Sequence, residues 1–253
     1  MNMIWIRTPS VLMALGLVFY LMLLAACSTL DREPRTDPEP VAPSQVSDFG
    51  TLYAQNCAGC HGAEGRGGAS IALANPVYLA IVDETTMQNV VANGVRGTSM
   101  PAFAQSAGGM LTERQIEVIT SGIFSGWGHK QVIDGANPPS YAAKAAGNVD
   151  RGQLAFGTYC ASCHGSEGGG TQKGSAITND SFLALVSDQG LRTIVITGRP
   201  ELGAPDWRGN VPGRPTPMTD QEITDVVAWL ASRRVQNPGQ PYSASNSAQR
   251  PEK

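Results

Sequence analysis

CAGCH, residues 57–61, is followed 103 residues later by CASCH, residues 160–164. The chain of 253 residues contains only five cysteines and three histidines. The two pentapeptides therefore hold all but one of the cysteines and all but one of the histidines. This distribution indicates that one kind of site is built twice.

Two cysteines three positions apart can each form a thioether with a vinyl group of one porphyrin, and the histidine that follows can coordinate its iron. The motif therefore predicts two covalently attached haem c groups. The attaching residues are Cys57, Cys60 and His61 in the first copy and Cys160, Cys163 and His164 in the second. The alternatives are a thioredoxin-like redox pair, a disulfide, or a zinc site with four cysteine ligands. None of these requires a histidine at the same place after both pairs, so haem attachment is favoured.

An internal repeat extends beyond the motifs. CAGCHGAEGRGG aligns with CASCHGSEGGG, and LTERQIEVI from Leu111 aligns with MTDQEITDVV from Met218, each with a threonine that suits a helix N-cap. Between these two segments, the offset of the alignment is one residue larger than the offset of 103 between the motifs. It pairs Leu79 with Leu183, Val91 with Val195 and Gly94 with Gly198. Each copy predicts a short helix into CxxCH, a glycine-rich loop, a helix over 83–92 or 188–197, a second loop and a closing helix. No stretch alternates at period two, which predicts an all-α fold.

The first residues have the layout of a secretory signal peptide, with Arg7 followed by an apolar run from Val11 to Ala26. This run is shorter than the roughly 20 residues that cross a bilayer as a helix. LAAC, residues 24–27, resembles a bacterial lipobox, which implies lipidation of Cys27. The alternative is an uncleaved anchor helix. Both interpretations place the remainder outside the cytoplasm, and the first predicts a lipid-anchored protein of the bacterial cell envelope that faces the periplasm.

Composition limits the partners. The formal net charge is −3, and this weak acidity argues against nucleic acid, whose binding needs a basic surface. STLDREPRTDPEPVAPSQV, which follows Cys27, has four prolines and no apolar period, so it predicts an extended tether. The expected organisation is a signal peptide (1–26), a tether (27–46), a first domain (47–127), a linker (128–148), a second domain (149–234) and a polar tail (235–253).

Both motifs have the form CxxCHGxxGxG, and together with their repeats they resemble tandem class I cytochromes c. The resemblance covers roughly residues 48–127 and 149–234 and is strongest to the dihaem subunit of cbb-type oxidases and to cytochrome subunits of other respiratory complexes. It implies two all-helical domains, each wrapped around one covalent haem c. It also implies that the first and last helices of each domain cross beside the haem, with Tyr53 and Phe156 facing the closing helix.

In this family, the iron ligand opposite the histidine is usually a methionine in a loop of the form MPxF or MPxW. The segment GTSMPAF matches it, which implies that Met100 is the sixth ligand in the first domain. The second domain has ELGAPDW, with Ala204 in the corresponding place. Met218 is the nearest replacement, but its repeat partner is Leu111, so it could equally be a packing residue. An open or water-bound iron, or a histidine from another protein, is the remaining option.

Other polar residues near the motifs give weaker signals. His129 is expected to be a solvated linker residue rather than a ligand. Glu64 and Glu167 follow the two motifs and suit either turn formation or electrostatic tuning of the haem. Near the ELGAPDW segment in sequence lie Arg192, Arg199 and Arg208. Their positions in the sequence do not indicate that any of them lies on the open side of the second haem.

The leading interpretation is a membrane-tethered dihaem cytochrome c that transfers single electrons to and from redox partner proteins of a respiratory chain. A fixed subunit of a larger respiratory complex differs only in the permanence of the interface. The competing hypothesis is a haem enzyme or ligand-binding protein whose second iron has an open coordination position.

Overall fold

The computed structural model describes Tyr20 and residues 41–128, 130–209 and 216–235. The predicted signal peptide apart from Tyr20, the lipidation candidate Cys27, most of the tether and tail, and His129 lie outside these residues. Among the residues described, no helix is both long enough and apolar enough to span a bilayer. The chain divides into two units, Met1–Ala42 and Pro43–Lys253, and all the elements below belong to the second.

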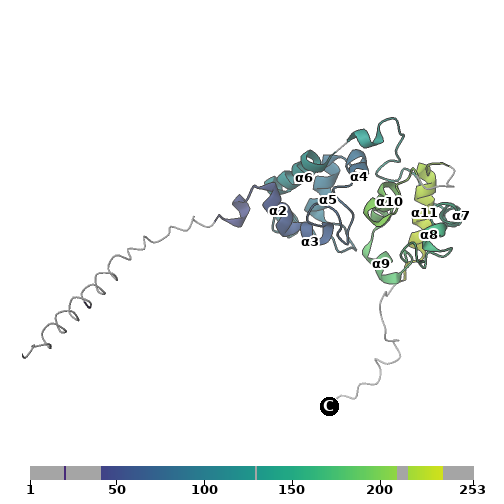
Figure 1. Ribbon diagram of the computed structural model, residues 1–253. Coiled ribbons are helices and arrows are strands. Elements are labelled where there is room, and N and C mark those ends of the chain that lie inside the picture. Colours follow the sequence, from purple (N-terminus) through teal and green to yellow (C-terminus); the bar gives the residue numbers. More distant parts are fainter. Residues whose placement is uncertain (1–19, 21–40, 129, 210–215, 236–253) are drawn as a thin grey trace, which may run out of the picture. The chain divides into compact units, whose positions relative to one another are not determined.

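The first repeat consists of five helices. They are α2 (Phe49–Asn56), α3 (Ala58–His61), α4 (Pro76–Ile81), α5 (Glu84–Asn93) and α6 (Glu113–Trp127), with short 3-10 turns η1 (Pro43–Gln45) and η2 (Gln105–Ala107). A further 3-10 turn, η3 (Lys130–Ile133), begins the linker. These helices are labelled in Figure 1.

The second repeat has the same order. Its helices are α7 (Val149–Tyr159), α8 (Ala161–His164), α9 (Asp180–Leu185), α10 (Asp188–Thr197) and α11 (Asp220–Ser232), with the 3-10 turn η4 (Pro200–Leu202). The described residues contain only two isolated β-bridges, Ala104 with Leu111 and Arg199 with Ala204. The predicted all-α fold is therefore confirmed.

Helix starts are encoded by the same kinds of residue in both repeats. Thr112 and Thr219 are the N-caps of α6 and α11, as predicted, and each forms a capping box with the residue three positions on, Gln115 or Glu222. Helices α4 and α9 were not predicted from the sequence. Each has only six residues and is preceded by an N-cap asparagine whose side-chain oxygen accepts hydrogen bonds from the N–H groups of the second and third helical residues, which in sequence looks like a turn.

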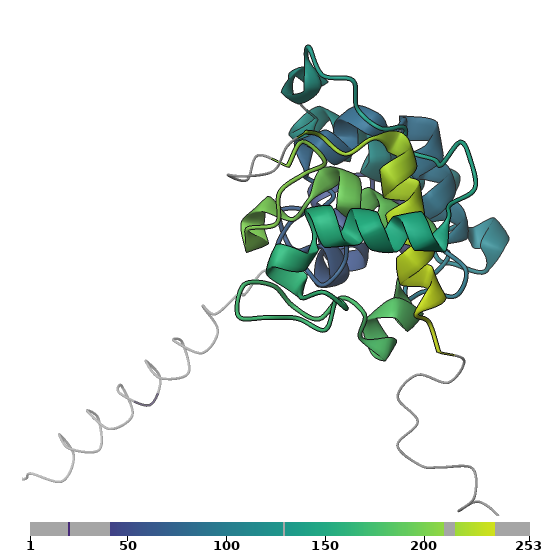
Figure 2. The same cartoon turned by 90° about the vertical axis from the view of Figure 1, so that its right-hand side faces the viewer.

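The first and last helices of each repeat cross at close range, as Figure 2 shows for α7 and α11. In the second repeat, a Cβ added to Gly152 of α7 would lie 2.0 Å from the Asp225 carbonyl oxygen and 2.8 Å from the Trp229 Cβ. In the first repeat, the glycine is on the other helix: a Cβ on Gly122 of α6 would lie 2.2 Å from the Phe49 ring. The repeat alignment pairs Gly152 with Phe49 and Trp229 with Gly122. In the second repeat the glycine thus lies on the first helix and the large side chain on the last helix. In the first repeat the arrangement is reversed.

Each repeat has its own apolar core. Leu52, Leu79, Ile119 and Ile123 are among the buried residues of the first, and Leu183, Ile196, Ile223 and Val226 are among those of the second. The aromatic residues face the closing helices as expected. The Tyr53 and Trp127 rings pack edge to face at 5.1 Å, and the Phe156 and Trp229 rings lie 4.3 Å apart.

Candidate haem-binding sites

Each CxxCH motif forms a single helical turn. Cys57 ends α2 and begins α3 with φ −118° and ψ −36°, and Cys160 joins α7 to α8 with φ −118° and ψ −35°. Residues three apart on a helix lie on one face, so the two thiols of each motif are presented together. Cys57, Cys60 and Cys163 form no disulfide within the described chain. The spacing of the two cysteines on one helical turn is compatible with thioether bonds to one porphyrin.

A backbone hydrogen bond orients each motif histidine. His61 Nδ1 lies 2.8 Å from the Ile71 carbonyl oxygen, and His164 Nδ1 lies 2.7 Å from the Ser175 carbonyl oxygen. A carbonyl can only accept, so Nδ1 carries the proton and Nε2 keeps its lone pair. This is the arrangement in which a histidine ligand is fixed by an outer partner while its other nitrogen coordinates metal. Both histidines therefore fit a haem iron, and the two acceptors were not identified from sequence.

The two sites differ in burial. His61 is 7% exposed, whereas His164 is partly exposed. Burial lowers the pKa of His61, although its hydrogen bond to Ile71 opposes this, and the lower pKa favours the neutral imidazole that an iron ligand needs. Burial, together with the neighbouring Cys60, raises the pKa of the Cys57 thiol to about 11. The first site is thus the drier one.

The two motifs do not come together at one metal centre. Among the described residues, no three histidine, cysteine, aspartate or glutamate side chains lie in positions to share a metal ion. The zinc alternative, which would need both cysteine pairs around one ion, therefore has no geometric support.

Met100 and Ala204 occupy equivalent positions. The Val95 N–H donates to the Met100 carbonyl at 3.0 Å, and the Arg199 N–H donates to the Ala204 carbonyl at the same distance. The glycine just before each pair has positive φ and lies against the following loop: a Cβ on Gly94 would be 2.7 Å from the Met100 oxygen, and one on Gly198 would be 2.7 Å from the Ala204 oxygen. Met100 also packs against the first core. The predicted correspondence of the two loops is therefore seen in the structure.

Met218 takes the place of Leu111. The Leu111 N–H donates to the Phe103 carbonyl and the Met218 N–H donates to the Trp207 carbonyl, both at 2.8 Å. Leu111 is 5% exposed and Met218 is 7% exposed, each within the core of its own repeat. These contacts give Met218 a packing position, and its role as an iron ligand stays a prediction.

The three arginines that lie near the ELGAPDW segment in sequence have protein partners. Arg192 is buried and donates to Asp220 and Thr224 and to linker carbonyls. Arg208 pairs with Asp206 at 2.5 Å. Arg199 contacts Glu201 and the Gly68 carbonyl. Glu167, which follows the second motif, pairs with Arg233 at 2.8 Å.

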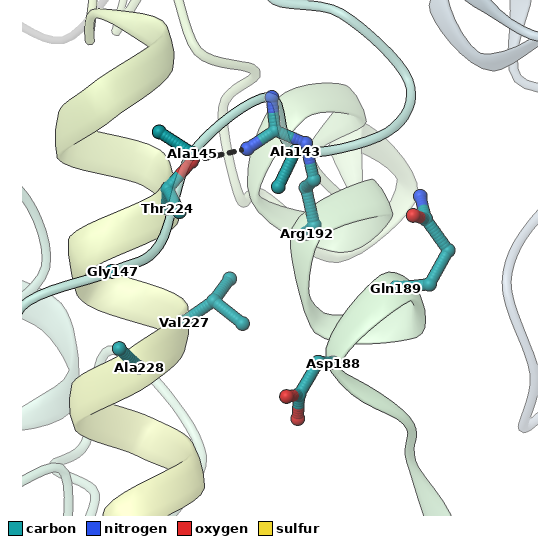
Figure 3. A pocket seen from close by; sticks show the side chains of 9 residues that line it. All are labelled: Ala143, Ala145, Gly147, Asp188, Gln189, Arg192, Thr224, Val227 and Ala228. Atoms are coloured by element: carbon teal, nitrogen blue, oxygen red, sulfur yellow. Dashed lines mark hydrogen bonds between the residues drawn. The ribbon is translucent and has the colours of Figure 1, made fainter.

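A pocket of about 230 Å³ lies between the linker, α10 and α11 (Figure 3). None of its lining residues belongs to a CxxCH motif. Its polar side chains are engaged within the protein, since Arg192 binds Thr224, Gln189 donates to the Tyr141 carbonyl and Asp188 pairs with Arg234. The pocket is therefore separate from the candidate haem sites.

Comparison with known proteins agrees with this geometry. The family model for cbb3-type cytochrome c oxidase subunit III matches residues 44–120, and the family model for cytochrome c matches residues 149–234. The chain carries two cytochrome c domains. These domains, with their CxxC motifs, imply covalently bound haem c.

A curated relative of these cytochrome c domains is the cbb3-type cytochrome c oxidase subunit CcoP of Azospirillum sp. (strain B510). It is 30% identical over an alignment of 126 residues that covers 46% of this chain and 38% of that protein. The match therefore spans less than half of the relative's length.

Two solved structures are also similar. A reducing HAO-like protein complex from Kuenenia stuttgartiensis is 19% identical with a TM-score of 0.39, covering 78% of this chain and all of the other (100%). The thiosulfate dehydrogenase TsdBA from Marichromatium purpuratum is 21% identical with a TM-score of 0.28, covering 86% of this chain and 52% of the other.

Proposed function

We propose that this protein is a dihaem cytochrome c that transfers single electrons in a bacterial respiratory or related redox chain. The main support for the proposal is that both repeats contain the same CxxCH helical turn. In each turn the two cysteines lie on one face, and the histidine Nδ1 is hydrogen-bonded to a backbone carbonyl oxygen. Haem c, when bound, supplies an iron that changes between the ferrous and ferric states. The protein residues hold it, exclude water and set its potential.

The first haem would be attached to Cys57 and Cys60 and coordinated by His61, with Met100 as the sixth ligand. A thioether ligand favours ferrous iron and raises the reduction potential, which suits an electron carrier. The second haem would be held by Cys160, Cys163 and His164. Its sixth ligand would be Met218 or a group from outside the chain.

We further propose that Cys27 is lipidated after signal cleavage, so that the two domains are anchored to a membrane and face the periplasm. Similarity to a cbb3-type oxidase subunit supports a respiratory complex as partner. The protein would serve either as a mobile carrier or as a subunit of such a complex, and it would meet small redox proteins through a limited surface.

A second candidate function follows from Ala204. Alanine has no donor atom for iron, and it stands where the first domain has Met100. If Met218 only packs, the second iron has an open position that could bind a small ligand such as peroxide or a diatomic gas. This alternative makes the second domain a ligand-binding or catalytic site supplied with electrons by the first.

Optical spectra of the purified holoprotein with carbon monoxide separate these alternatives. We expect two haems per chain by mass. If Met218 is a ligand, the reduced wild type shows no carbon monoxide shift and Met218→Ala gains one. If the second site is open, the wild type already binds the gas and Met218→Ala does not change the response. A chain that carries no covalent haem when expressed with a haem-attachment system would refute the proposed function.

A further inference from the structure

The contact surface between the two cytochrome c domains is built from buried polar and apolar groups. Asn75, the N-cap of α4, is 5% exposed, and its Nδ2 donates to the Thr197 carbonyl at the end of α10 at 3.2 Å. Its Oδ1 meanwhile caps α4 by accepting from the Val77 and Tyr78 N–H groups. Both ends of this amide are therefore used, one within the first domain and one across to the second.

Arg199 forms a second polar contact between the domains. Its Nη2 donates to the Gly68 carbonyl at 3.1 Å. Gly68 belongs to the loop after the first CxxCH motif and lies so close to Cys60 that a Cβ there would be 2.1 Å from the Cys60 carbonyl oxygen. The Arg199 backbone, in turn, is bridged to Ala204 in the loop that replaces the methionine loop. A short path of contacts thus joins the Ala204 loop of the second domain to the haem-attachment turn of the first.

Apolar packing supports these hydrogen bonds. Val77 of α4 is 4% exposed and belongs to the core cluster of the second domain rather than to that of the first. Ile81, one turn later, also packs against that cluster. Removing such side chains from water favours association of the two surfaces. Helix α4 therefore contributes one face to each domain.

Hydrogen bonds and apolar packing also hold the linker against the domains. Arg192, which is 2% exposed, donates from Nε and Nη2 to the Ser140 carbonyl at 3.1 and 2.9 Å and pairs with Asp220 at 2.6 Å. Figure 3 shows the same guanidinium bonded to Thr224 of α11. Tyr141, the next linker residue, packs against the core of the first domain. The linker is thus held to both domains.

We propose that Asn75 and Arg199 are positioning residues that lock the two domains into one rigid electron-transfer unit, so that electrons pass between the haems within one molecule across this junction. The inference rests on the proposed dihaem function. In each transfer, one ferrous haem becomes ferric as the other ferric haem becomes ferrous, and no bond is made or broken. The first electron comes from an external redox protein.

The chain provides matched variants for testing this junction. Asn75→Asp keeps the oxygen that caps α4 but removes the donor to Thr197. Asn179→Asp is its control, because Asn179 caps α9 in the same way and its side-chain nitrogen donates to no residue within the described chain. Arg199→Ala removes the contact with Gly68, and Arg233→Ala is its control, because Arg233 pairs with Glu167 inside the second domain.

Hydrogen exchange of the intact holoprotein should report opening of the junction directly. We expect Asn75→Asp and Arg199→Ala to speed amide exchange about tenfold in both segments 66–74 and 196–204, since each removes a hydrogen bond that crosses the interface. The controls should leave both segments unchanged. Laser-flash reduction should show slower electron exchange between the haems in the two junction variants only, with unaltered haem spectra.

Unchanged exchange in both junction variants would overturn the proposal, as would two separate unfolding transitions in the wild-type holoprotein. Failure of the proposed function looks different. In that case, the hydrogen-exchange effect would remain in the junction variants while electron exchange between the haems was absent in the wild type as well.

Discussion

Gly152 approaches Asp225 so closely that a Cβ at residue 152 would stand 2.0 Å from the Asp225 carbonyl oxygen. Since Cβ atoms do not come this near to a carbonyl, any side chain at this position must push α7 away from α11. Gly152→Ala should therefore destabilise the second domain by about 1–3 kcal/mol. Denaturant unfolding of the holoprotein measures the change.

The same helix provides the control. Gly157, also in α7, has no heavy atom within 4 Å of an added Cβ. Gly157→Ala should be neutral or stabilise the domain by up to about 1 kcal/mol, because alanine favours the helix. Equal losses for the two variants would show that the crossing is not limited by contact at Gly152.

The buried carboxylate of Asp225 should make the second domain sensitive to acid. Burial by itself would raise the pKa of Asp225, but hydrogen bonds from Arg151, from the Asn148 N–H and from Gln221 lower it overall. A carboxylate whose pKa is depressed by folding stabilises the protein above its unfolded pKa of about 4, and this contribution disappears as the pH falls through the folded pKa.

Asp225→Asn should therefore lose about 1–2 kcal/mol of stability near neutral pH, a modest value because Arg151 stays hydrated. The loss should begin to shrink as the pH falls below about 4 and should disappear once the pH is below the depressed folded pKa, where the wild-type carboxylate is protonated as well. Denaturant unfolding at several pH values tests this. Asp188→Asn is the surface control, since Asp188 is 64% exposed beside Arg234. A difference between wild type and Asp225→Asn that did not depend on pH would contradict the assignment.

Opposite substitutions at Met100 and Ala204 should have opposite effects on carbon monoxide binding and on reduction potential. Met100→Ala should open the first iron to carbon monoxide and lower the higher of two reduction potentials. If the second iron is open, Ala204→Met should close it to the gas and raise the lower potential. Potentiometric titration followed optically measures both. A Met100→Ala protein with both potentials unchanged would remove Met100 from the coordination sphere.

The different burial of the two haem-binding sites should give the two haems different reduction potentials in the wild type. Water stabilises the extra positive charge of ferric iron, so a drier site favours the ferrous form. His61 is buried and His164 is partly exposed. We therefore expect the haem of the first domain to have the higher potential, which the Met100→Ala variant assigns because only that haem should shift. A shift of the lower potential instead would reverse the order.

Local signals in the sequence predicted much of the fold. The repeat, the threonine caps of α6 and α11 and the equivalence of Ala204 with Met100 depend on residues close together in the chain, and the structure confirms them. The helices α4 and α9 were missed because an asparagine before six residues is as typical of a turn as of a cap.

Contacts between residues that lie far apart in the chain could not be predicted from the sequence. Asn75 and Thr197 lie 122 positions apart, and nothing near either residue indicates that they meet. The glycines at the helix crossings were equally hidden, since a glycine within a helix is usually only a weak point, and its role appears when the partner helix is in place.

The exchange of small and large residues at these crossings affects how the chain can assemble. Pairing α2 with α11 would set Phe49 against Trp229 in a space that holds one large side chain, and pairing α7 with α6 would set Gly152 against Gly122 and leave a void. Repeated domains in one chain can fold with their helices wrongly paired. Here each opening helix fits only its own closing helix, so the two domains can share an architecture without competing for each other's parts.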